Sequence, residues 1–81
     1  MGLRVKFSGT VVRLESDGFG IIEFDKPVGA SANKVGIISN STATIVLSGN
    51  LRPGAHVNGE AETDERDIAE VKTVIVSDEK P

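Results

Sequence analysis

A phenylalanine between two glycines is the feature of this sequence best suited to binding chemistry. Phe19 follows a turn signal and lies between Gly18 and Gly20. Glycines beside a ring leave room for a flat group to lie on it, and stacking of a nucleic-acid base on a ring contributes about 1–3 kcal/mol. Cations elsewhere in the first 52 residues could contact phosphates. These cations are Lys6, Arg13, Lys34 and Arg52.

Each of these features also has a purely structural interpretation. The chain has three phenylalanines, and such residues more often pack in a core, as we expect of Phe7 and Phe24. Phe19 could likewise pack in the core or at its edge. The glycines could serve only a turn and a bend in a strand, and the cations could be solvated charges on strand faces.

The sequence offers little for catalysis or metal binding. It contains no nucleophile elbow, phosphate loop or metal-ligand spacing. His56 is the only histidine and there is no cysteine, so a zinc ion would lack soft ligands. The acidic turn with Asp64, Glu65 and Asp67 lacks the glycine and spacing of a calcium loop. We therefore expect a non-enzymatic protein without metal or cofactor.

The size and charge of the chain limit its class. Its 81 residues are enough for one domain, and the absence of cysteine requires an aliphatic core. The net charge of −3 counts against strong non-specific binding of nucleic acid. Residues 1–52 carry six cations and four anions, whereas residues 53–81 carry three cations and eight anions, so one face could be mildly basic. With no signal peptide or apolar span, we expect a cytoplasmic protein without membrane association, monomeric by default.

Alternation of apolar and polar residues predicts the strands that position these side chains. Leu3, Val5 and Phe7 alternate with polar residues, and the phase shifts after Gly9. A phase shift beside glycine predicts a bulge or bend in a long first strand. A second strand is expected at residues 19–25 after the turn.

The second strand is expected to have one face that points into the core and one that points to solvent. Ile22 and Phe24 alternate with Phe19, Ile21 and Glu23, which predicts that the first pair points inward and the other three outward. Further strands are expected at residues 35–39, 55–63 and 68–76, separated by a loop at 26–34 and a hairpin loop at 63–67.

The pattern as a whole favours an all-β domain. A bent first strand and a long connection after the third predict a five-stranded Greek-key barrel of the oligonucleotide/oligosaccharide-binding type (OB fold). Residues 40–50 are expected to form a short irregular or helical insert, although a short strand is an alternative. The domain is expected to span residues 1–76, followed by a disordered tail at 77–81.

The segment GTVVRLESDGFGIIEFD, from Gly9 to Asp25, resembles the opening of the bacterial cold-shock domain. That family begins with a glycine, a valine two residues later, a polar turn and a Gly-Phe-Gly-Phe-Ile strand. Weaker similarities follow along the chain, at Val35, Ile37 and Ser39, at Leu51 to Val57, and at Ala69 and Val71. The resemblance implies a module that binds single-stranded RNA or DNA on a sheet face. Phe19 would then stack a base, Ile21 and Ile38 would make apolar contacts, and Lys6, Arg13, Lys34 and Arg52 would meet the backbone.

The chain departs from the family at most of the stacking positions. Arg13 replaces a tryptophan, Ile21 replaces the second phenylalanine, Gly36 replaces a ring and Ile38 replaces a histidine. Because Phe19 alone remains, binding is expected to be weak. The alternative is that the same face binds a protein partner with no appreciable affinity for nucleic acid.

Overall fold

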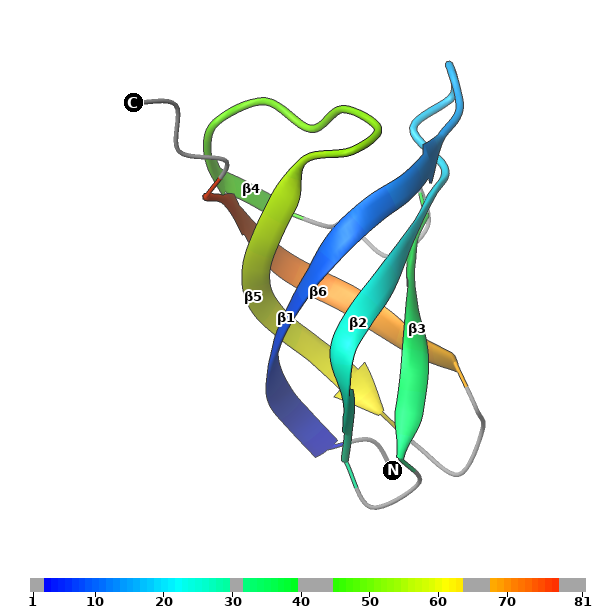
Figure 1. Cartoon of the computed structure of the whole chain (residues 1–81), viewed down its shortest axis with the longest axis vertical. Coiled ribbons are helices and arrows are strands. Elements are labelled where there is room, and N and C mark those ends of the chain that lie inside the picture. The colour runs from blue at the N-terminus through cyan, green and yellow to red at the C-terminus, as the bar shows by residue number, and fades with distance from the viewer. Residues whose placement is uncertain (1–2, 30–31, 40–44, 64–67, 78–81) are drawn as a thin grey trace.

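The protein is all-β, as the sequence predicts. The computed structural model describes residues 3–29, 32–39, 45–63 and 68–77, and no helix occurs in these ranges. No helix of this part of the chain is therefore long and apolar enough to cross a membrane. The strands, labelled in Figure 1, are β1 (Leu3–Leu14), β2 (Gly20–Val28), β3 (Asn33–Ile38), β4 (Ile45–Ser48), β5 (His56–Thr63) and β6 (Ile68–Val76).

Five of the strands form one closed sheet. The order β3-β2-β1-β5-β6 is closed by parallel pairing of β3 with β6. The other pairings in this ring are antiparallel. The short β4 continues alongside β6 beyond the end of β3, also in parallel. In Figure 1, β6 accordingly crosses behind β1, β2 and β3.

Strand β1 is long and bent because it pairs with two neighbours. Residues 3–10 pair with β5, and residues 9–14 pair with β2. The register shifts between Val11 and Arg13, so Val12 is the extra residue of a bulge. Gly9 marks the bend, since a Cβ there would collide with the carbonyl oxygen of Glu23. The predicted bend of the first strand is confirmed.

Aliphatic side chains and two phenylalanines fill the interior. The rings of Phe7 and Phe24 lie 4.9 Å apart, centroid to centroid, and are tilted by 35°. Gly36 lies against the Phe24 ring, because a Cβ at this glycine would be 2.7 Å from Cζ. The largest fully buried apolar side chains are Val11, Ile22, Val57, Val71 and Val74. The core positions expected for Phe7 and Phe24 are confirmed.

The structure corrects three predictions along the chain. β2 continues to Val28 and β3 begins at Asn33, so the expected loop at 26–34 is much shorter. The expected irregular or helical insert is replaced in its described part, residues 45–50, by strand β4, so the alternative of a short strand is confirmed there, with β6 as the pairing partner; residues 40–44 lie outside the described ranges. Ser77, expected in a disordered tail, donates its backbone N–H to the carbonyl of His56 at 2.8 Å; residues 78–81 lie outside the described ranges.

Candidate binding surface

Strand β2 separates the core from the candidate surface. Ile22 and Phe24 are buried, whereas Ile21 is half-buried and Glu23 is exposed. This alternation is the one predicted from the sequence. The outer face of β1, β2 and β3 is therefore the surface to which the predicted binding residues must belong.

Phe19 lies outside the core, at the turn that leads into β2. Its carbonyl accepts a hydrogen bond of 2.7 Å from the N–H of Glu15, and its own N–H donates to Asp17 Oδ1 at 2.9 Å. Gly18 adopts a φ of 94°, a conformation that glycine accepts without strain. The ring is half-buried and does not pack against the buried core cluster. The turn thus fixes the backbone of Phe19 while leaving part of its ring accessible.

Arg13 and Ile21 lie next to each other on this surface. They are Cα partners between β1 and β2, and Ile21 in turn pairs with Ile37 on β3. Ile37 is half-buried, like Ile21. Arg13 Nε lies 2.7 Å from Glu15 Oε2, and both side chains are about half exposed or more. Arg13, Ile21 and Ile37 therefore form a row across the three strands with two apolar side chains and one cation. Glu15 neutralises part of the charge of that cation.

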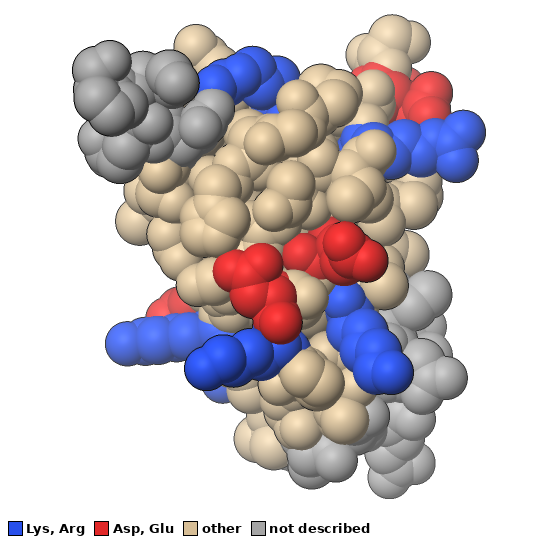
Figure 2. Space-filling model, viewed as in Figure 1, with Lys and Arg blue, Asp and Glu red and all other residues tan. Residues whose placement is uncertain are grey.

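The neighbouring row carries an acidic side chain at its centre. Thr10 on β1 and Val35 on β3 are the Cα partners of the exposed Glu23. Figure 2 shows acidic side chains near the middle of the visible face, with Lys and Arg side chains above and below them. A phosphate backbone crossing this face would therefore meet repulsion at its centre.

The expected surface position of Ile38 is wrong. Its side chain is 5% exposed and belongs to the core cluster, and Gly36 also points inward. Val35 and Ile37 instead face outward on β3. Because side chains alternate along a strand, a correspondence shifted by one residue exchanges the two faces. Val35 and Ile37, and not Gly36 and Ile38, therefore form the outward face of β3.

The remaining predicted cations do not gather around Phe19. Lys6 lies on the opposite half of β1, where its Cα partner on β5 is Glu60, and Lys34 is exposed near the start of β3. Arg52 precedes a turn whose Gly54 N–H donates to the carbonyl of Val11 at 2.7 Å, close to the bulge of β1. The structure thus brings Arg13, Phe19 and Ile21 together, with the turn after Arg52 beside them.

A second group of polar side chains was not anticipated from the sequence. His56 Nε2 lies 3.0 Å from Asp25 Oδ2, and His56 Nδ1 lies 3.2 Å from Ser77 Oγ. Asn58 Nδ2 donates to Ser77 Oγ at 2.8 Å and its Oδ1 accepts from Ser8 Oγ at 2.5 Å. Alternation indicated that His56 and Asn58 share a face, but the pairing of β5 with β1 and β6 was needed to find their partners.

These polar side chains do not form a metal centre. Within the described ranges, no group of three or more His, Asp or Glu side chains is arranged to hold a metal ion. Comparison with protein families, curated proteins and solved structures gives no match for this chain.

Proposed function

We propose that this chain is a small OB-type Greek-key barrel that binds single-stranded RNA or DNA weakly, without catalysing a reaction. The binding surface is the outer face of β1, β2 and β3. The observation that carries the proposal is the position of Phe19, half-buried but outside the core, at the head of the strand that also presents Ile21 beside Arg13. A ring, an apolar side chain and a cation are the components that hold a stacked base and its phosphate.

The arrangement of strands supports the barrel part of the proposal. One long bent strand, β1, is shared between β2 and β5, and parallel pairing of β3 with β6 closes the ring. A five-stranded ring of this kind is typical of OB barrels, whose ligands lie on the strands following the first loop. The Phe19 surface occupies that region.

The charges on the surface make the binding weak. Glu15 neutralises part of the Arg13 charge, and Glu23 lies in the centre of the face. Few phosphates would be engaged, so the logarithm of the affinity should fall with the logarithm of salt concentration by only about 0.7 per phosphate contact.

The test is a titration of 15N-labelled protein with oligo(dT) and oligo(U) of six nucleotides at low salt. Amide shifts should concentrate at Arg13, Phe19, Ile21 and Ile37 and shrink as salt is added. Phe19→Ala should weaken binding by about 5- to 150-fold, the equivalent of one stacked base. Leu47→Ala is the control, because Leu47 is an exposed apolar residue on β4. Absence of shifts at millimolar oligonucleotide, or equal binding by Phe19→Ala, would reject the proposal.

The second candidate is a protein partner on the same face. Ile21, Val35 and Ile37 form a half-buried apolar strip on β2 and β3, with an acidic rather than basic centre at Glu23. An apolar strip with charged neighbours is suited to protein docking. If the oligonucleotides leave the spectrum unchanged, this candidate takes precedence.

A further inference from the structure

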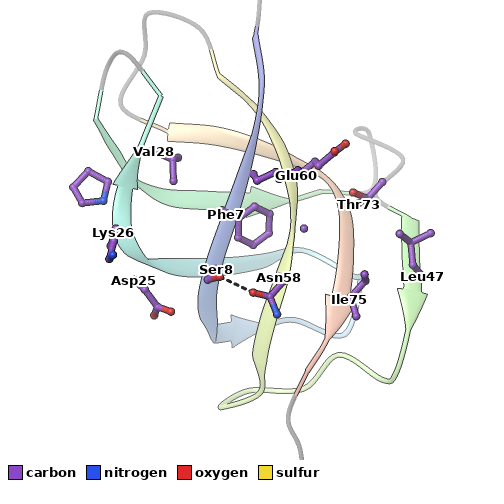
Figure 3. Close-up of a pocket in the computed structure, with 13 residues that line it drawn as sticks. Phe7, Ser8, Asp25, Lys26, Val28, Leu47, Asn58, Glu60, Thr73 and Ile75 are labelled. Atoms are coloured by element: carbon purple, nitrogen blue, oxygen red, sulfur yellow. Dashed lines mark hydrogen bonds between the residues drawn. The ribbon is translucent and has the colours of Figure 1, made fainter.

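A hollow of about 880 Å³ lies over β1 and β5, away from the Phe19 surface. In Figure 3, Lys26 and Asp25 lie on one side of it, Leu47 and Ile75 lie on the other, and β1 and β5 cross between them. The volume is within the usual range of small-molecule sites, about 300–1,000 Å³. The hollow therefore has room for a ligand that spans both sides.

Strands β1 and β5 form the floor of the hollow. Gly59 of β5 is the Cα partner of Phe7 on β1, and a Cβ at Gly59 would collide with the carbonyl oxygen of Thr73. Glycine is therefore required where the backbone of β5 approaches that of β6. Ser8 and Asn58 complete the floor, joined by the hydrogen bond drawn in Figure 3.

One side of the hollow is apolar and open to solvent. Leu47 is 60% exposed and Ile75 is 41% exposed, which makes them two of the four exposed large apolar residues among the described ranges. They come from the adjacent strands β4 and β6. Covering them with an aliphatic chain would remove apolar surface from water, at about 25 cal/mol per Å².

The charges of the hollow are unequally matched. Of its two carboxylates, Glu60 is paired with Arg4 at 3.3 Å, whereas Asp25 contacts the imidazole of His56 at 3.0 Å, which matches a carboxylate charge only when the ring is protonated. Its two lysines, Lys6 and Lys26, form no ion pair with any residue the structure describes. Even with the Asp25 carboxylate counted as unmatched, the two lysines leave the hollow with one positive charge in excess.

We propose that this hollow binds an aliphatic carboxylate, with its head at Lys6 and Lys26 and its chain over Leu47 and Ile75. The free ammonium groups favour an anion, and the apolar side favours a hydrocarbon chain. Asp25 and Glu60 line the same space, so a singly charged carboxylate meets less repulsion than a doubly charged phosphate. This site is independent of the nucleic-acid surface proposed above.

The experiment is an NMR titration with octanoate, with 1-octanol and octyl phosphate as separate arms. Octanoate and octyl phosphate are kept below their micellar concentrations, and 1-octanol is kept below its solubility limit. Octanoate should shift amides of β1, β5 and the end of β2 in a saturable manner, and it should bind more tightly than either comparison ligand. The double variant Lys6→Gln/Lys26→Gln should weaken octanoate binding by about tenfold and leave octanol binding unchanged. Leu47→Asn should weaken both ligands by severalfold.

The control is Lys34→Gln, because Lys34 is an exposed lysine on β3 that does not line the hollow. It should leave octanoate binding unchanged, and spectra of all variants report whether the fold is retained. Equal affinity for octanol and octanoate would show that the lysines do not favour a carboxylate over a neutral head group, and would overturn the proposal. Tighter binding of octyl phosphate, or an equal loss in Lys34→Gln, would also overturn the proposal.

Discussion

The imidazole of His56 joins two strands that are not neighbours, because its Nε2 lies 3.0 Å from Asp25 Oδ2 on β2. Strand β1 lies between β2 and β5 in the sheet. His56 Nδ1 lies 3.2 Å from Ser77 Oγ, whose hydroxyl donates to the backbone carbonyl of His56 at 3.3 Å. A chain of side chains thus ties β2, β5 and the end of β6 together outside the core.

Ser77→Ala should destabilise the protein by about 1 kcal/mol. The hydroxyl oxygen accepts the hydrogen bond from Asn58 Nδ2 at 2.8 Å, and its removal leaves a partly buried amide donor without its acceptor. Urea unfolding measures the change, and exchange of the backbone amide of residue 77 should become faster. Ser16→Ala, in the exposed turn before β2, is the matched control and should change stability little. Equal effects of the two variants would contradict the structural role of this chain.

Gly36→Ala should cost about 1–3 kcal/mol, because the new methyl group would overpack the core. Its Cβ would lie 2.7 Å from Phe24 Cζ and 2.9 Å from Val71 Cγ2. Phe24→Leu shortens the opposing side chain, so the double variant should be less destabilised than the sum of the single variants by about 1 kcal/mol. Thermal or urea unfolding of the four proteins gives this coupling free energy.

The control for this double-mutant cycle of Gly36→Ala and Phe24→Leu is a second cycle that combines Phe7→Leu with Gly36→Ala. Phe7 contacts the Phe24 ring at 4.9 Å between centroids but is not among the atoms nearest to Gly36. Its coupling to Gly36→Ala should therefore be smaller. Strict additivity of Gly36→Ala and Phe24→Leu would mean that Gly36 is not required by this ring.

Glu15→Gln should strengthen oligonucleotide binding by a few-fold at low salt. The substitution removes the carboxylate 2.7 Å from Arg13 Nε and frees that guanidinium for a phosphate. The slope of the logarithm of the affinity against the logarithm of the salt concentration should become steeper by about 0.7, the value expected for one added phosphate contact. Glu62→Gln is the control, because Glu62 lies near the end of β5 beside Lys72. A gain of equal size in the control would attribute the effect to net charge alone.

The faces of β1 and β2 could be predicted because their patterns are local. Ile22 and Phe24 alternate with polar or outward residues, and Gly9 coincides with the change of phase at the bend. In β3 the run from Val35 to Ile38 has no polar residue to set its phase. The resemblance alone sets the predicted phase there and places Gly36 and Ile38 outside, whereas the packing of Phe24 against Gly36 shows that this face is the inner one.

The remaining features depend on pairings between distant residues. Strand β4 contains only four residues and forms where β6 extends beyond β3. The contacts of His56 join residues 31 and 21 positions away along the chain. Alternation predicts which residues share a face of one strand, but it does not predict the register between strands. The hollow over β1 and β5 could not be predicted for the same reason.

Gly9 and Gly59, where a Cβ would collide with a backbone carbonyl oxygen of the neighbouring strand, give a final prediction. The same glycine-to-alanine substitution should lower the free energy of unfolding more at these two positions than at a glycine with open space around it. At Gly9 a Cβ would collide with the Glu23 carbonyl oxygen, so Gly9→Ala should separate β1 from β2 and cost about 3 kcal/mol or more. Gly59→Ala should behave similarly, because the Thr73 carbonyl oxygen occupies the corresponding space.

Gly54→Ala is the comparison, since its Cβ would meet nothing within 4 Å and only its φ of +89° opposes the change. Its cost should stay near 1–2 kcal/mol, roughly the strain of a left-handed alanine. Urea unfolding should therefore rank Gly54→Ala as more stable than Gly9→Ala and Gly59→Ala. Amide exchange should quicken along β1 and β2 in Gly9→Ala, and along β5 and β6 in Gly59→Ala, because each methyl group pushes apart the strands that meet at its glycine. If all three variants lost the same stability, backbone conformation rather than close strand contact would be the reason for glycine at these positions.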